Sequence, residues 1–184
     1  MLHFLRKKRL NLNPEQTEQE NKIPDYVSYS SIKDWKFCPY YYKLTRVDGI
    51  PSGRDSIHTA FGKAVHSTSE NIFKQEKQDS FDYSENFIQN FKKEFDSLPK
   101  EIKNNISEKE LNDFINQGKE LVQLVYPATK TYLGDFSFFS AEESLYEDIV
   151  EYQRDDYKYK GFIDLILKTS DGIYHIIDWK TCSW

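Results

Sequence analysis

Two acidic residues and a lysine interrupt two apolar, β-branched runs in the last part of the sequence. The segment YKGFIDLILKTSDGIYHIIDWKT, residues 159–181, contains Asp164, Asp178 and Lys180 among aliphatic and aromatic residues. Burying an unpaired charge costs free energy, so a carboxylate in such a run requires a partner or a function. Two carboxylates and a lysine on one surface are suited to binding a divalent cation and to handling a proton.

A tight turn between the two runs decides whether these carboxylates meet. The residues TSDG, 169–172, predict a hairpin loop formed by the last three of them, with the glycine in the left-handed conformation. In that register Asp164 lies directly opposite Asp178. Because side chains alternate along a strand, Lys180 shares the face of Asp178, and Trp179 points into the core. Carboxylates opposed in this way repel one another unless a cation lies between them.

A two-residue loop, Asp171-Gly172, is the alternative, because Asp-Gly also favours a tight turn. It shifts the register by one residue, pairs Asp164 with Trp179 and moves the two carboxylates to opposite faces of the sheet. They would then be ordinary charges at a sheet edge. Turn chemistry favours the three-residue loop, and the sequence leaves both registers open.

Apolar residues at three- and four-residue spacing predict helices in the first part of the chain. Ser30 or Ser31 can cap the first helix, and Pro39 should bend it. Pro127 and then Gly134 should end the last. The apolar face of the first helix would consist of Ile32, Trp35, Phe37 and Leu44. The predicted helices span about Ile32 to Thr45, a segment around Phe61 to Phe73, residues 81–93 and residues 108–125.

The residue pattern changes after Gly134. Residues 136–152 and 157–180 predict strands of an antiparallel meander, so helices come first and strands last. At 184 residues the chain suits one domain. We therefore expect an α/β fold in which N-terminal helices pack on a mixed or antiparallel sheet over residues 26–184. Residues 1–25 are basic and then polar without periodicity, and predict a flexible arm.

Charge and cysteine content limit the classes of function. The formal net charge of −5 offers no overall basic field for nucleic acid, so any such contact must be local or assisted by metal ions. Two distant cysteines, Cys38 and Cys182, suggest a reducing compartment. Neither a signal peptide nor an apolar run of about 20 residues is found. We expect a cytoplasmic protein without a membrane span.

Four motifs together resemble those of the PD-(D/E)XK nuclease superfamily, in its RecB-like exonuclease branch. They occur in the family's order: SYSSIKDWKFCPYYY, then GKAVH with Gly62 and His66 at G-x-x-x-H spacing, then GFID ending in Asp164, then DWKT with Asp178 and Lys180. The resemblance implies a restriction-endonuclease-like core. It also implies a metal-dependent DNA nuclease with an exonuclease-like action.

The resemblance assigns a role to each of these residues. Asp164 and Asp178 would bind Mg²⁺ or Mn²⁺ together with His66, and the backbone carbonyl of Trp179 would add a ligand. Lys180 would assist the attacking water. Glu143 resembles an acidic residue that the family often has in the strand before GFID, and is a further ligand candidate. The implied partners are DNA and a helicase or recombination protein, in recombination, repair or phage DNA processing.

The sequence departs from the family in two respects. The family continues past DWKT with a helix that carries Q-x-x-x-Y, so we expect the C-terminal part of the fold to be missing from this chain. Some members bind an iron–sulfur cluster through four cysteines, the first in a context like Cys38-Pro39. Two cysteines cannot supply that set, so we expect no cluster. The alternative function is a DNA-binding or assembly subunit that retains the fold without catalysis.

Overall fold

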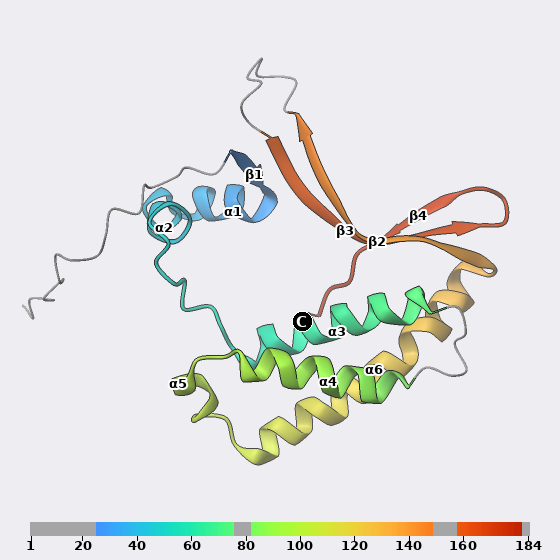
Figure 1. Cartoon of the computed structure of the whole chain (residues 1–184), viewed down its shortest axis with the longest axis horizontal. Helices are drawn as coiled ribbons and strands as arrows, with labels where there is room; N and C mark the ends of the chain where they lie inside the picture. Colours follow the sequence, from blue (N-terminus) through green and yellow to red (C-terminus); the bar gives the residue numbers. More distant parts are fainter. Residues whose placement is uncertain (1–24, 76–81, 149–157, 182–184) are drawn as a thin grey trace, which may run out of the picture.

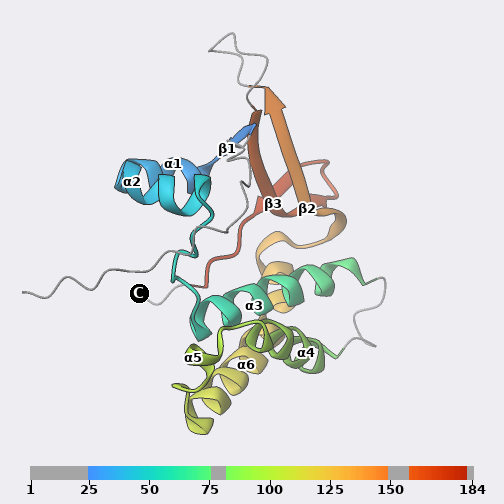
Figure 2. The same ribbon diagram turned by 60° about the vertical axis from the view of Figure 1, so that its left-hand side comes forward.

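The computed structural model describes residues 25–75, 82–148 and 158–181. Among these residues, three long helices form a layer against one side of a four-stranded mixed sheet. A pair of short helices lies beside one end of that sheet, apart from the helical layer (Figure 1). A second view shows the same separation between the short helices and the layer (Figure 2). This arrangement agrees with the α/β, restriction-endonuclease-like fold predicted from the sequence.

The short helices are α1 (Tyr29–Phe37) and α2 (Pro39–Tyr42), followed by a π-helical turn η1 (Lys43–Val47). The predicted bend at Pro39 is confirmed, because Cys38 is extended and the proline occupies the first position of α2. The predicted cap at Ser30 or Ser31 is wrong. Ser28 caps α1, and its side chain accepts a hydrogen bond from the backbone N–H of Ser31 at 3.2 Å.

The helical layer consists of α3 (Ile57–Lys74), α4 (Tyr83–Asp96) and α6 (Glu108–Leu133), with the single turn α5 (Lys100–Lys103) between the last two. The prediction that Pro127 ends α6 is wrong, since the helix continues to Leu133. A proline removes one backbone hydrogen bond, and the buried side chains of Val125 and Thr129 hold the helix on either side of it. Gly134, at φ 73°, provides the predicted stop.

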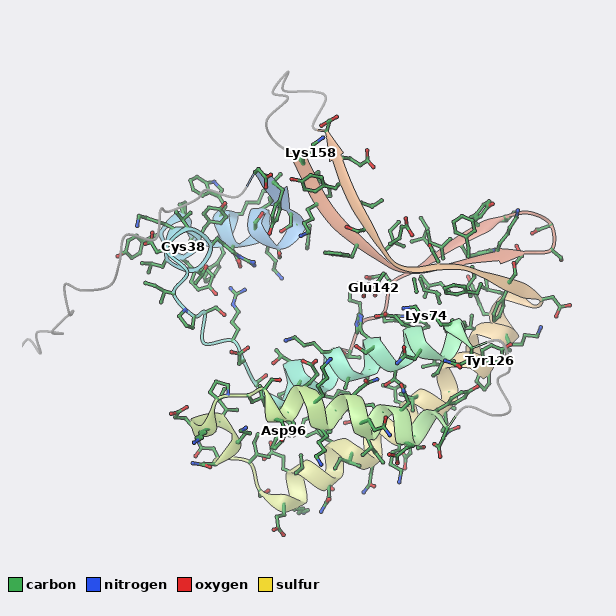
Figure 3. The ribbon with its side chains drawn as sticks, in the orientation of Figure 1. Cys38, Lys74, Asp96, Tyr126, Glu142 and Lys158 are labelled. Atoms are coloured by element: carbon green, nitrogen blue, oxygen red, sulfur yellow. The ribbon has the colours of Figure 1, made fainter. Side chains whose placement is uncertain are left out.

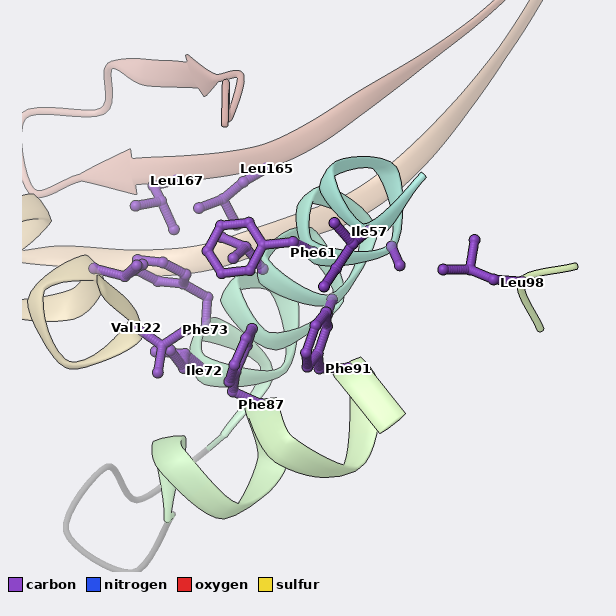
Figure 4. Packing of buried hydrophobic residues seen from close by; sticks show 14 residues of the cluster. Ile57, Phe61, Ile72, Phe73, Phe87, Phe91, Leu98, Val122, Leu165 and Leu167 are labelled. Carbon is purple, nitrogen blue, oxygen red and sulfur yellow. The ribbon is translucent and has the colours of Figure 1, made fainter. Parts of the chain in front are cut away.

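The core lies between α3, α4, α6 and the sheet. Phe61, Phe87 and Phe91 form an aromatic cluster, with the Phe61 and Phe87 ring centroids 5.8 Å apart (Figure 4). Leu165 and Leu167 reach this cluster from the sheet and are fully buried. These contacts fix α3 against the strand that carries GFID. The positions of the GKAVH and GFID motifs relative to one another therefore depend on this core.

The sheet contains β1 (Tyr26–Ser28), β2 (Phe136–Asp148), β3 (Lys158–Thr169) and β4 (Tyr174–Ile177). The antiparallel order of β2, β3 and β4 is as predicted. The sequence did not predict β1, which pairs in parallel with the start of β3 and makes the sheet mixed. Three residues are too short to show a strand pattern, so this pairing depends on the tertiary structure.

The hairpin between β3 and β4 has the three-residue loop. Leu165 pairs with Ile177, and Thr169 donates its backbone N–H to the carbonyl of Ile173 at 3.0 Å. Gly172 has φ 86°, the left-handed conformation that this loop requires. The two-residue alternative is therefore excluded. The ladder ends at the Leu165–Ile177 pair, immediately before the positions of the two predicted metal ligands.

The prediction of a flexible arm over residues 1–25 falls, apart from Asp25, outside the described residues. Across the part of the chain that the structure describes, no helix combines the length and the apolar character needed to cross a membrane.

Candidate active site

His66 and Asp164 lie together where α3 packs on β3. The distance from His66 Nδ1 to Asp164 Oδ2 is 3.4 Å. Both side chains are only partly accessible, with 28% of His66 and 13% of Asp164 exposed. The neighbours of His66 on α3, Ala64 and Val65, are buried and anchor this turn of the helix against the core. The structure thus brings together two predicted site residues that are separated by almost one hundred positions in the sequence.

The segment after β4 joins this pair through its backbone. The Trp179 N–H donates a hydrogen bond of 2.9 Å to Oδ2 of Asp164. The Trp179 ring stacks on Phe73 of α3, with centroids 6.2 Å apart, so the predicted inward orientation of this side chain is confirmed. One carboxylate therefore links β3, α3 and the segment that carries DWKT.

Gly62 shows why the G-x-x-x-H spacing suits this arrangement. A Cβ atom added at Gly62 would lie 2.8 Å from Oγ1 of Thr181, closer than real Cβ contacts. The DWKT segment therefore passes directly over α3 at Gly62. His66 follows one helical turn later and lies on the same face. A glycine permits the crossing, and the histidine after it meets Asp164.

Asp178 and Lys180 form a second pair. Lys180 Nζ donates to Oδ1 of Asp178 at 2.5 Å, and 68% of the lysine side chain and 59% of the aspartate side chain are exposed. Within residues 25–75, 82–148 and 158–181, no three His, Cys, Asp or Glu side chains are arranged to hold a metal ion. The predicted site thus consists of two pairs, His66 with Asp164 and Asp178 with Lys180.

A pair of glutamates that the sequence did not single out lies beside this site. Glu70 is one turn after His66 on α3, and Glu142 lies on β2 with a left-handed φ of 52° (Figure 3). Burial, followed by a hydrogen bond to Glu142 and its charge, raises the pKa of Glu70 to about 7, against the opposing effect of Lys74. The position of Glu70, four residues after His66, is the feature of the sequence that could have identified it.

Glu143, the predicted further ligand, is exposed on β2 opposite Ile163. Its neighbour Glu142, rather than Glu143, is the glutamate of β2 that contacts a carboxylate of α3. Adjacent residues of a strand point to opposite faces. The left-handed backbone at Glu142 breaks this alternation locally, so the choice between the two glutamates could not be predicted from strand periodicity.

The donor chemistry fits a hard divalent cation. Carboxylate oxygens are preferred by Mg²⁺, and an imidazole nearby also suits Mn²⁺. The 3.4 Å approach of His66 to Asp164 brings one donor of each kind together. Asp178 is held to Lys180 by an exposed ion pair, which contributes less than about 1 kcal/mol and is easily broken. The residues present therefore fit a site for Mg²⁺ or Mn²⁺.

A known protein family matches the sequence. The sequence matches the family model of the PD-(D/E)XK nuclease superfamily over residues 26–183. The chain therefore belongs to the PD-(D/E)XK nuclease superfamily, whose members are typically metal-dependent nucleases. No curated protein matches the sequence.

Proposed function

We propose that the chain is a divalent-metal-dependent deoxyribonuclease of the RecB-like branch. It would act as an exonuclease in DNA recombination or repair, or in phage DNA processing, beside a helicase or recombination protein. The position of Asp164 carries this proposal. Its carboxylate faces His66 and accepts the Trp179 N–H, in a chain that belongs to a nuclease superfamily.

In this proposal Asp164, Asp178 and His66 hold Mg²⁺ or Mn²⁺, and the Trp179 carbonyl supplies a further ligand. A bound divalent cation would lower the pKa of a water molecule and offset the charge of the phosphate. Lys180 orients the attacking water or stabilises the negative charge that develops on the phosphate. Glu142 on β2, which contacts Glu70 one turn after His66, adds negative charge near the proposed cation, and Glu143 stays a further ligand candidate.

Asp178 must leave Lys180 to reach a cation beside Asp164. Both side chains are more than half exposed, so water replaces the lost contact at little cost. Lys180 and the cation therefore compete for Asp178. Removal of the lysine should leave metal affinity unchanged or increase it, although it removes a group needed for hydrolysis.

The test separates ligand residues from the lysine. Asp178→Asn should abolish the rise in melting temperature that Mg²⁺ or Mn²⁺ produces, because a charged ligand is lost. It should also lower DNA cleavage by at least about 100-fold. Lys180→Ala should keep the metal-induced rise in melting temperature and still lower cleavage by about 100-fold. Cleavage by Asp178→Asn at the parent rate would contradict the proposal.

The alternative is a DNA-binding or assembly subunit without catalysis. One observation favours it: among the described residues, no three acidic or histidine side chains are arranged to hold a metal ion. Under this alternative the parent protein binds DNA, but its melting temperature does not respond to Mg²⁺ or Mn²⁺ and it cleaves no DNA. The thermal melts with and without metal therefore distinguish the two functions.

A further inference from the structure

The first two helices bury polar side chains and expose aromatic ones. On α1 the buried residues are Ser31 and Asp34. Four large rings lie largely in solvent, and we call them the aromatic platform: Tyr29 (72% exposed), Trp35 (54%), Phe37 (76%) and Tyr40 (67%). Single exposed apolar residues are common, but four large exposed rings within twelve residues are an unusual density and suit contact with a ligand or partner.

Neighbouring rings hold two members of the platform in place. Trp35 meets Tyr42 edge-on, with centroids 5.6 Å apart and planes at 85°. Phe37 meets Tyr41 in the same manner at 6.2 Å and 87°. The guanidinium of Arg54 lies 4.7 Å from the centre of the Tyr41 ring. Exposed side chains fixed in this way lose little conformational entropy when a ligand binds.

The interior under the platform is held together by ion pairs and not by apolar packing. Asp34 is 3% exposed, and its Oδ2 accepts hydrogen bonds from Nε and Nη2 of Arg46 at 3.0 and 2.8 Å. Its Oδ1 accepts from Nη1 of Arg54 at 3.0 Å. These bonds tie η1 and the following loop to α1. The aromatic side chains are therefore not needed to fill the interior of this region.

The charge around the platform is positive, although the chain as a whole carries −5. Residues 26–54 contain five basic and two acidic residues. Both acidic residues are in ion pairs, Asp34 with its two arginines and Asp48 with Lys43 at 2.5 Å. Lys33 and Lys36 are exposed on α1 and alternate in the sequence with the residues of the platform. The patch therefore complements a polyanion that also offers flat apolar faces.

We propose that the aromatic platform stacks against unpaired bases of a single-stranded nucleic acid, while Lys33 and Lys36 contact its phosphates. The inference rests on the proposed function and names the form of its substrate, a single strand rather than a duplex. Bases within a duplex cover one another's faces and cannot stack on exposed rings. A second copy of this chain, or an apolar protein segment, would not require the interleaved lysines.

The location of the platform suits this role. In both ribbon views the segment after β4 runs down to α3 on the side of the sheet where α1 and α2 lie (Figures 1 and 2). That segment carries Asp178 and Lys180, so a strand held by α1 and α2 lies on the same side as the proposed catalytic residues.

The test measures binding without cleavage. The full chain is mixed, in EDTA, with a labelled single-stranded thymidine oligonucleotide or with a blunt duplex, and affinity is followed by fluorescence anisotropy. Trp35→Ala should weaken single-strand binding about 10-fold and leave duplex binding unchanged. Tyr132→Ala is the matched control, because Tyr132 is 88% exposed on α6 and lies outside the platform. It should leave both affinities unchanged. Tyr29→Ala provides a second platform variant if Trp35→Ala does not fold.

The lysines have a separate readout. Replacing both Lys33 and Lys36 by alanine should reduce the slope of log affinity against log salt by about 1.4, as expected for two lost phosphate contacts on a single strand. An unchanged slope would contradict the phosphate role.

Single-strand affinity that survives both platform substitutions overturns the inference. If Trp35→Ala instead converts a self-associating parent to monomer and leaves DNA affinity unchanged, the surface binds a second copy and the inference also fails. Failure of the proposed function looks different. In that case single-strand binding still depends on Trp35, but no metal ion supports cleavage.

Discussion

The helical layer and the α1–α2 pair use aromatic residues in opposite ways. In the layer, the rings of Phe87 and Phe91 are 0% and 2% exposed and stack at 5.6 Å with their planes 9° apart. In α1, Phe37 is 76% exposed and Asp34 occupies the interior. Both regions show the same apolar spacing in the sequence. The spacing therefore identifies the helix, but not which of its faces is buried.

This difference separates stability from binding. The apolar core of the layer holds α3 against β3 and so sets the distance between His66 and Asp164. The ion pairs of Asp34 hold the backbone of α1 in place and leave its aromatic rings free to contact a ligand. A substitution in the layer should lower the stability of the fold. A substitution on the α1–α2 surface should leave stability intact and weaken ligand binding.

The largest expected effect on stability is the difference between two substitutions, one in each region. Phe87→Ala should lower the free energy of unfolding by about 3–5 kcal/mol, because it leaves a cavity in the core. Phe37→Ala should change it by less than about 1 kcal/mol. Chemical denaturation of both variants measures the difference. Equal losses would show that Phe37 is part of a core and would contradict the division.

The next effect concerns the close contact of α4 with α6. A Cβ atom at Gly118 would lie 2.0 Å from the Phe87 ring, which is fully buried and cannot move away. Gly118→Ala should therefore cost about 1–3 kcal/mol. Gly161→Ala is the matched control on β3, since its nearest heavy atom is at 3.6 Å. A neutral Gly118→Ala in thermal or denaturant melts would mean that the layer tolerates overpacking.

Asp34 provides the corresponding test within the α1–α2 pair. Burial alone would raise the pKa of Asp34, but hydrogen bonds and charge from Arg46 and Arg54 outweigh it and lower the pKa below 3.8. Asp34→Asn should cost about 2 kcal/mol near neutral pH, less than for a fully buried pair because both arginines remain accessible to water. Asp48→Asn, in an exposed pair with Lys43, should cost less than about 0.5 kcal/mol.

The sign of the pH dependence follows from the lowered pKa. The ionised Asp34 stabilises the fold above the pKa of the unfolded state, and this contribution is lost as the pH falls through the folded pKa. Parent and Asp34→Asn should therefore differ most above about pH 5, and the difference should shrink as the pH falls below 3.8. A difference that grows in acid would contradict the assignment.

The smallest expected effect arises from Glu70. Its carboxyl holds a proton in the folded protein up to about pH 7, whereas the unfolded chain releases it near 4.5. Stability should therefore fall as the pH rises through this window, by about 1 kcal/mol in metal-free buffer. Glu70→Gln should remove most of that slope. Glu120→Gln, on the exposed face of α6, should leave it unchanged.

The sequence predicted the features that depend on local chemistry. The turn TSDG determined the register of the last hairpin, and the G-x-x-x-H and GFID motifs identified His66 and Asp164, which lie together. The features that it did not predict arise from contacts between distant segments. They are the parallel strand β1, the Glu70–Glu142 pair and the exposure of the rings on α1, which depends on the arginines that bind Asp34.

Cleavage of labelled DNA by the purified full chain tests the central claim most directly. Single-stranded and duplex DNA are incubated with Mg²⁺, with Mn²⁺ or with EDTA, alongside Asp164→Asn. The account predicts products with either metal, none in EDTA, and at least about 100-fold less product from Asp164→Asn. Intact DNA in the presence of both metals, from a protein that binds the same DNA, would contradict the nuclease function and favour the binding subunit.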